Sequence, residues 1–287
     1  TVSMFSCSKN FGRVDIYLVA LSFVAVMLLC TNKHLWLLVP IVAVCVMIHQ
    51  GYVFMYFNII LVLLIYRFFT EKKENRLRNG ALFFCVFLVG SSLFLYFEFF
   101  SRTNGMEIVD EIIRNASAVS YQGSYHETLI DHEILNVDLS DVEWDFHKEN
   151  FVQLPFFALM TAPFIWLLIQ FAKNVFSRCH LLEEKIKYFF VCFGFLTLLP
   201  NYILKVDYAR WTYAMFSYFS IMVLALIVLK DEIVIESIEE VANMRKKHPG
   251  MILLIPYLTI FVPLWDVYFN QASKHFSDWL NVYVHFM

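Results

Sequence analysis

Long, uninterrupted apolar runs are the feature that most constrains the fold of this chain of 287 residues. The runs are roughly 15–22 residues long, which matches the length of a helix that crosses the hydrocarbon core of a membrane. The strands of a membrane barrel would instead alternate apolar and polar residues over about ten positions. Because only helices and closed barrels satisfy every backbone polar group in lipid, the sequence predicts an all-α, polytopic bundle of transmembrane helices.

The composition agrees with a membrane protein and excludes an ordinary soluble domain. Apolar residues make up 60% of the chain, charged residues make up 16%, and the mean hydropathy is +0.62. Soluble domains are about 45–50% apolar and about 25% charged. The six cysteines form no CxxC pair and no ladder in a polar loop, so we expect no metal site, no disulfide framework and no cofactor.

Eight candidate spans organise the chain into a single membrane domain that covers residues 1–287. The second and third spans are separated only by His49, Gln50 and Gly51, and one helix across both would be roughly 52 Å long, far beyond a hydrocarbon core of ~30 Å. We therefore expect a hairpin or a re-entrant pair, with Gly51 suited to its turn. The predicted spans are 14–30, 35–48, 52–69, 81–100, 151–172, 188–204, 211–229 and 251–269.

Lysine and arginine in the connections predict the orientation. If the connection at 70–80 is cytoplasmic, alternation places fourteen basic residues on that side and eight on the other. The outer side then carries a large loop at 101–150 with a net charge of −8. The cytoplasmic segment at 230–248 is expected to form an amphipathic surface helix, because its isoleucines and a valine fall on one side.

Ionisable residues at the outer ends of spans are the first candidates for a functional site, because charge near lipid is costly and usually faces a cavity or a partner. Asp207 and Arg210 lie three positions apart and would share one face of a helix. They form either an interfacial ion pair or a site in which Asp207 positions Arg210 to bind an anion such as phosphate. Lys205 would add charge to the same site.

Histidines supply the other candidates. His49, at the turn of the short hairpin, is a plain interfacial residue, a general base or a metal ligand. In the outer loop, His126 is followed by Glu127, and His132 lies six positions after His126 without forming an HExxH pattern. This stretch is a solvated acidic surface, a metal site or a place where sugar hydroxyls are hydrogen-bonded.

Two short motifs and the overall plan of helices with one large outer loop carry a family resemblance. The sequence resembles bacterial membrane proteins that polymerise O-antigen or capsular polysaccharide. Members of this group often carry His-Glu where this chain has His49-Gln50, and a proline where it has Asn58. The two motifs are His49-Gln50-Gly51-Tyr52-Val53-Phe54 and Asp207-Tyr208-Ala209-Arg210-Trp211.

The resemblance implies a polymerase or glycosyltransferase that uses a polyprenyl-diphosphate-linked glycan at the outer face of the bacterial inner membrane. It implies that Arg210, with Lys205, holds the diphosphate and stabilises its leaving charge, while Asp207 orients Arg210. It also implies that His49 or Glu127 takes the proton from the acceptor hydroxyl. The side chains expected to bind substrate are Lys205, Tyr208, Tyr52, His126, Glu127 and His132.

Two other functions stay open from the sequence. A transporter or flippase of a lipid-linked or anionic substrate would carry ionisable groups near the midplane and repeat symmetry between its halves. The strongest polar groups here fall instead at one interface. A non-catalytic membrane component whose outer loop binds another protein is the third possibility. The expected partners are the bilayer, a lipid-linked glycan and other proteins of polysaccharide assembly, with no nucleic acid.

Overall fold

The computed structural model describes residues 15–100, 154–200, 208–247 and 249–250. Within these residues the chain is helical and contains no strand, which confirms the predicted all-α class. The acidic loop and the eighth predicted span lie outside them. The described elements are α2 (Asp15–Thr31), η1 (Leu35–Leu37), α3 (Leu38–Ile48), α4 (Tyr52–Met55), α5 (Phe57–Thr70), α6 (Lys73–Phe99), α10 (Leu154–Arg178), α11 (Leu182–Phe193), η3 (Gly194–Leu198), α13 (Tyr208–Val228) and α14 (Glu232–Lys247), where η marks a 3-10 helix.

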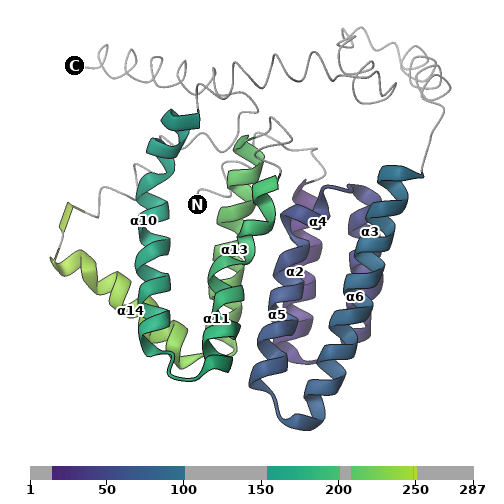
Figure 1. The fold of residues 1–287 in the computed structure, drawn as a ribbon, viewed down its shortest axis with the longest axis horizontal. Helices are drawn as coiled ribbons and strands as arrows, with labels where there is room; N and C mark the ends of the chain where they lie inside the picture. The colour runs from purple at the N-terminus through teal and green to yellow at the C-terminus, as the bar shows by residue number, and fades with distance from the viewer. Residues whose placement is uncertain (1–14, 101–153, 201–207, 248, 251–287) are drawn as a thin grey trace, which may run out of the picture.

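The long helices stand side by side and alternate in direction (Figure 1). The connections that follow α2, α5, α10 and α13 lie at one end of the bundle, drawn lowest in Figure 1 and called the lower end below. The turn between α3 and α4, the end of α6 and the start of α13 lie at the opposite, upper end. The described connections therefore alternate between two ends, as the predicted topology requires.

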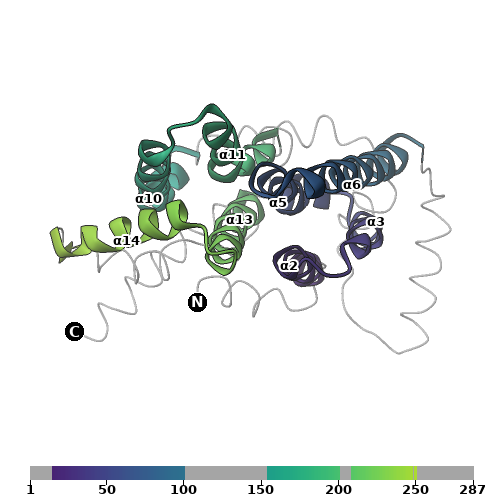
Figure 2. The same ribbon diagram turned by 90° about the horizontal axis from the view of Figure 1, so that it is seen from below.

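Helices α2, α3, α5 and α6 form the first half of the described structure (Figure 2). Helix α5 packs on α6 and α2, and α3 packs on the same two helices. The predicted hairpin between the second and third spans is confirmed, with one addition: after Ile48 the chain makes the single helical turn α4 before α5 begins. Tyr56, whose φ of −128° is not helical, separates α4 from α5.

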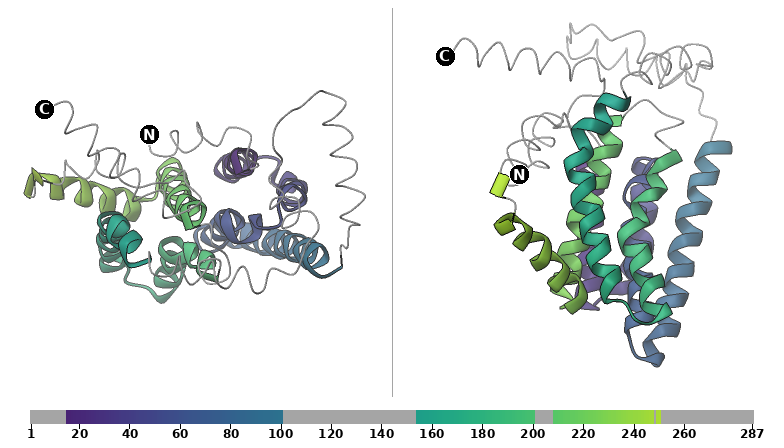
Figure 3. Two further views of the ribbon diagram at one scale, coloured as in Figure 1. Left: turned by 90° about the horizontal axis from the view of Figure 1, so that it is seen from above. Right: turned by 60° about the vertical axis from the view of Figure 1, so that its left-hand side comes forward.

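Helices α10, α11, α13 and α14 form the second half (Figure 3). Helix α11 packs on α5, and α13 packs on α2, so the core continues from one half into the other. Aromatic side chains fill its centre, because their rings bury a large apolar area and their hydroxyls can be hydrogen-bonded. The largest side chains that are fully buried include Tyr52, Tyr56, Tyr188, Tyr218 and Phe57.

The outer surface of the helices is strongly apolar. Helix α6 is the one described helix whose length and composition would let it cross a membrane, and only 11% of its most apolar 18-residue window is buried. Four further apolar helical stretches have 10–17 residues. Large apolar side chains on several other helices are also exposed, among them Phe23, Met27, Met47, Trp166, Ile169 and Leu224.

The structure forms helices in the seven predicted spans that fall within the described residues, but it does not confirm eight membrane crossings. Some spans have other bounds than predicted; α10, for example, runs to Arg178 rather than to residue 172. Helix α6 begins at Lys73 rather than at residue 81, so about two polar turns precede its apolar part. The span predicted at 188–204 does not continue as one α-helix, because α11 changes into the 3-10 helix η3 at Gly194.

Candidate functional site

The sequence predicts a site at the upper end, and the structure describes part of it. His49 lies between α3 and α4, Tyr52 begins α4, and Tyr208 and Arg210 lie in the first turn of α13. Helices α4 and α13 contact each other, so the elements that carry the two motifs pack together at one end of the bundle. The predicted site residues outside the described part of the chain are Lys205, Asp207, His126, Glu127 and His132.

His49 ends α3, and its extended backbone turns the chain toward α4. Its Nδ1 atom accepts a hydrogen bond of 2.9 Å from the backbone N–H of Gly51. A neutral imidazole whose Nδ1 is an acceptor carries its proton on Nε2. His49 is therefore a hydrogen-bond donor through Nε2, and it becomes a base there only after its tautomer changes. A Cβ on Gly51 would lie 2.8 Å from Cε1 of His49, so the glycine leaves space for the ring.

Tyr52 is fully buried in the core. Its hydroxyl accepts a hydrogen bond of 3.2 Å from Ser22 of α2. Its ring lies against those of Tyr56 and Phe57, with centroid separations of 6.4 and 6.2 Å. Tyr52 thus fastens α4 to the helices beneath it, and its role in substrate binding stays a prediction.

A buried polar seam joins the first turn of α5 to the 3-10 helix that follows α11. Asn58 is 3% exposed, and its amide nitrogen donates to the backbone oxygen of Gly194 at 3.1 Å and to the hydroxyl of Thr197 at 2.8 Å. The amide oxygen of Asn58 is buried and accepts no hydrogen bond from the described residues. Because an unpaired buried acceptor is unfavourable, this oxygen is chemically suited to accept a hydrogen bond from a hydroxyl group.

Tyr218 of α13 supports the same break in α11 from the other side. Its hydroxyl lies 2.9 Å from the backbone oxygen of Phe190 and 3.0 Å from that of Val191. The last carbonyls of a helix lack partners within it, and this phenol provides one. A Cβ on Gly194 would overlap the Tyr218 hydroxyl and lie 2.8 Å from Cγ2 of Val62, so any larger residue would force these side chains to shift.

At the lower end a buried carboxylate joins three helices. Asp231, which precedes α14, accepts hydrogen bonds at Oδ2 from the hydroxyls of Tyr66 and Tyr188, at 2.6 and 2.7 Å. Its Oδ1 atom accepts from the backbone N–H of Val234 at 2.9 Å, which caps the helix. The ammonium group of Lys187 lies 5.0 Å from the ring centroid of Tyr66 and 4.3 Å from that of Tyr188, so a cation accompanies the buried charge.

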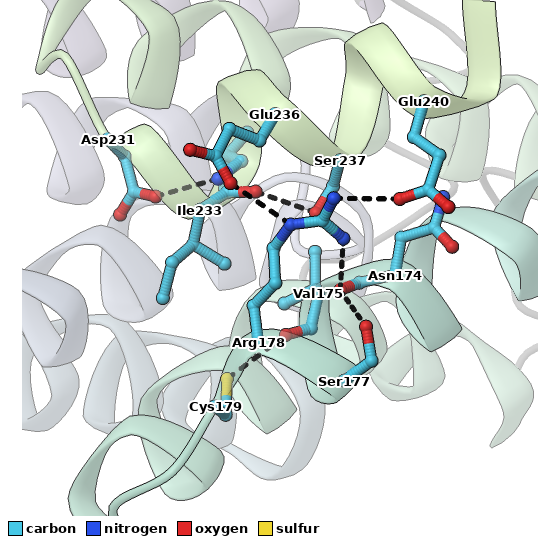
Figure 4. Close-up of polar contacts among 11 residues, drawn as sticks. Asn174, Val175, Ser177, Arg178, Cys179, Asp231, Ile233, Glu236, Ser237 and Glu240 are labelled. Atoms are coloured by element: carbon cyan, nitrogen blue, oxygen red, sulfur yellow. Dashed lines mark hydrogen bonds and ion pairs between the residues drawn. The ribbon is translucent and has the colours of Figure 1, made fainter. Parts of the chain in front are cut away.

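An arginine clamps α14 against α10 at the same end (Figure 4). Arg178 donates to Glu236 at 3.2 Å and to Glu240 at 2.7 Å, and a third bond of 3.0 Å reaches the backbone oxygen of Asn174. The hydrogen bond to Glu240 is the main reason why the pKa of Arg178 is raised. The predicted amphipathic helix therefore lies on the lower end of α10 and is held there by ion pairs on its polar side.

Asp231 and Asn58 are among the buried polar residues that sequence reasoning missed. An aspartate directly before an amphipathic helix is a typical N-cap, and that signal was available for Asp231. A polar side chain inside an apolar run was the signal for Asn58. Their partners come from segments far away in the sequence, so the seam and the carboxylate site required the three-dimensional arrangement.

The cysteines and the potential metal ligands form no cluster within the described part of the chain. The cysteines at 30, 45, 85, 179 and 192 are free thiols, and the same residues form no group of three or more potential metal ligands. The polar groups that the structure brings together among these residues are amides, phenols, carboxylates and guanidinium groups, all of which can form hydrogen bonds with hydroxyl groups.

No protein-family model matches this chain, and no match was found among curated proteins or solved structures. The choice of a function therefore rests on the chemistry and placement of the chain's own residues.

Proposed function

We propose that this protein is a polytopic integral membrane protein that spans a bacterial inner membrane with about eight helices. The observation that supports this is the outward apolar surface of α6, since the core helix of a soluble protein would have its apolar window mostly buried. Exposed apolar side chains on the neighbouring helices extend that surface. Helices of 14–17 residues such as α2 and α5 cover roughly 21–26 Å, so they need interfacial residues or a locally thinner bilayer.

We further propose that the protein transfers or polymerises surface polysaccharide, with a polyprenyl-diphosphate-linked glycan as donor. The observation that carries this proposal is that the elements bearing the two motifs pack together at the upper end, opposite the connections rich in lysine and arginine. Basic connections are typical of the cytoplasmic side, so the upper end is the outer one. A donor presented at the outer face meets the His49 turn and the start of α13 there.

The proposed chemistry assigns one task to each group. The acceptor hydroxyl oxygen attacks the anomeric carbon, and the bond from that carbon to the diphosphate oxygen breaks. Arg210 and Lys205 hold the departing diphosphate and its charge, and Asp207 orients Arg210. Since the neutral ring of His49 has its proton on Nε2, His49 donates a hydrogen bond to substrate, and the carboxylate of Glu127 accepts the proton of the acceptor.

The test is the length of surface polysaccharide in cells that lack the protein and are complemented with variants. Wild type should restore a ladder of long chains on a gel, whereas Arg210→Ala and His49→Ala should leave single repeat units at normal protein level. Lys185→Ala, an exposed change at the opposite end, is the matched control and should restore the full ladder. A chain length that never depends on the protein would show that the polymerase proposal is wrong, and a transport reaction would then be tested.

A further inference from the structure

The lower end of the bundle carries its positive charge unevenly. Beside α2, α5 and α6, the segments at 31–37 and 67–79 contain six basic and two acidic residues. Beside α10, α11 and α14, the segments at 173–187 and 228–247 contain eight basic and seven acidic residues. The first group, called the basic end below, therefore has a large net positive charge, while the second is nearly neutral.

A buried arginine builds the framework of the basic end. Arg67 is 3% exposed and donates to the backbone oxygen of Leu29, to Oδ1 of Asn32 at 2.7 Å and to the carboxylate of Glu71. The same Oδ1 of Asn32 accepts a bond of 2.9 Å from Arg78, whose guanidinium lies 3.7 Å from Glu71. One network of hydrogen bonds and ion pairs thus joins the ends of α2 and α5 to the start of α6. In this network the carboxylate of Glu71 is paired with two guanidinium groups.

The lysines around this framework stay exposed. Lys33 follows Asn32, Lys72 is the N-cap of α6, and Lys73 is the first residue of that helix. None of the three forms an ion pair with a residue in the described part of the chain, and Glu71 is paired with Arg67 and Arg78 instead. Three exposed lysines on the segments that the Arg67 network joins form a surface suited to bind an anion with several oxygens.

Apolar side chains border the same surface. Trp36, three residues after Lys33, is 67% exposed, and Leu77, between Arg76 and Arg78, is 81% exposed. Tryptophan is enriched where a membrane meets water, and exposed leucine beside basic residues is typical of surfaces that enter the headgroup layer. A free inorganic anion would contact only the charged groups, whereas a phospholipid would contact the charged and the apolar side chains together.

We propose that the basic end binds the phosphate headgroup of an anionic phospholipid in the leaflet that it faces. Lys33, Lys72 and Lys73 contact the phosphate oxygens, and Trp36 and Leu77 pack beside the glycerol and the first acyl carbons. This inference rests on the proposed membrane location, but not on the proposed glycan chemistry. Basic residues near an anionic leaflet are attracted to it, so three lysines should give a preference for anionic over zwitterionic lipid.

The experiment measures lipid binding to the purified full-length protein in detergent by native mass spectrometry, with phosphatidylglycerol or phosphatidylcholine added as the probe. Wild type should bind phosphatidylglycerol more tightly than phosphatidylcholine, and the triple variant Lys33→Gln, Lys72→Gln, Lys73→Gln should lose most of that preference. The matched control removes three exposed lysines from the nearly neutral half, by Lys173→Gln, Lys185→Gln and Lys246→Gln. This control variant should keep the preference for phosphatidylglycerol, although its net charge is identical to that of the first triple variant.

Three results would overturn the proposal. The first is a triple variant that retains the preference, and the second is a control that loses it equally, which would mean that only net charge matters. The third is displacement of the lipid by millimolar inorganic phosphate, which would identify a site for the free anion. Polysaccharide ladders from cells with the triple variant should stay long, so a failed lipid site is distinguishable from a failed polymerase proposal.

Discussion

The Oδ2 atom of Asp231 accepts a hydrogen bond of 2.6 Å from the hydroxyl of Tyr66, which ties the start of α14 to the lower end of α5. The same oxygen accepts a bond of 2.7 Å from Tyr188 of α11. The other oxygen caps α14 through the N–H of Val234. One carboxylate therefore satisfies two buried phenols and one helix terminus, and each of these loses its partner if the carboxylate is removed.

Asp231→Ala should lower the free energy of unfolding by about 2–5 kcal/mol. The lost N-cap accounts for about 1 kcal/mol, and each buried hydroxyl left without an acceptor adds about 1–3 kcal/mol before relaxation. Asp231→Asn keeps an oxygen acceptor and should lose less. Thermal unfolding of the detergent-purified protein measures the difference.

Glu232→Gln, a change at the exposed neighbouring position, serves as the control and should leave unfolding within about 0.5 kcal/mol of wild type. If Asp231→Ala proved as stable as that control, the hydrogen bonds to Tyr66 and Tyr188 would not contribute to the fold as described.

Gly194→Ala should destabilise the protein by about 1–3 kcal/mol, because the new methyl group would overlap the Tyr218 hydroxyl and press on Val62. The backbone at Gly194 has φ −59°, which any residue adopts, so the effect is steric rather than conformational. Gly80→Ala is the matched comparison: its nearest neighbour would be Phe68 at 3.5 Å, an ordinary contact. That change should be neutral or stabilising by up to about 1 kcal/mol, since alanine favours the helix. Equal melting temperatures for the two variants would show that a methyl group at position 194 does not clash with Tyr218 and Val62.

Arg178→Ala should loosen α14 from α10 without unfolding the bundle. The side chain of Arg178 is 28% exposed and its partners Glu236 and Glu240 are more exposed, so each ion pair contributes about 0.2–1 kcal/mol. Hydrogen exchange of the α14 amides should therefore rise a few-fold in the variant. In wild type the same exchange should rise with salt, because exposed pairs are screened. Exchange in Lys185→Ala, an exposed change that breaks no described ion pair, should match wild type.

Acid should fray the start of α11. The carboxylate of Glu184 accepts hydrogen bonds from the backbone N–H groups of Leu181 and His180, at 3.1 and 2.9 Å, and these bonds lower its pKa below the ordinary value of 4.5. Because the folded pKa is depressed, the stabilisation is fully present above pH 4.5 and is lost as the pH falls through the lower folded value.

The measurement is the protection of the Leu181 and His180 amides, followed by hydrogen exchange between pH 6 and pH 3 after correction for the intrinsic rate. Protection in wild type should fall toward the acid end. Glu184→Gln should show weaker protection with little change over that range, since the amide does not titrate. A wild-type profile as flat as that of the variant would show that the carboxylate does not hold these amides.

Hydrophobic patterning was sufficient to predict the all-α class and the alternation of connections between two ends, because the apolar runs and basic connections are local features of the sequence. It also predicted the turn at His49, where the polar residues interrupt an apolar stretch that is too long for one helix. It did not predict the single turn of α4 or the change of α11 into a 3-10 helix. Both depend on tertiary partners: the hydroxyl of Ser22 donates a hydrogen bond to that of Tyr52, and the side chain of Tyr218 lies against Gly194.

The candidate site was less predictable for the same reason. From the sequence, His49 is a plain interfacial residue, a general base or a metal ligand. The hydrogen bond from Gly51 to Nδ1, which no spacing rule indicates, places the ring's proton on Nε2. The Asp231 site lies in a segment that patterning describes only as amphipathic. A single Asp before a helix is common, and only the approach of Tyr66 and Tyr188 makes this one a junction of three helices.

The junction at Asp231 also has a consequence for synthesis of the chain. The ribosome adds Asp231 165 residues after Tyr66 and 43 residues after Tyr188. At about 5–20 residues per second, Tyr66 waits roughly ten to thirty seconds for its acceptor. Only the last 43 of those residues are added after Tyr188 has been made, so the phenol of Tyr66 is without its acceptor much longer than that of Tyr188. The hydrogen bonds that join α5, α11 and α14 at this point can therefore form only after Asp231 has been synthesised.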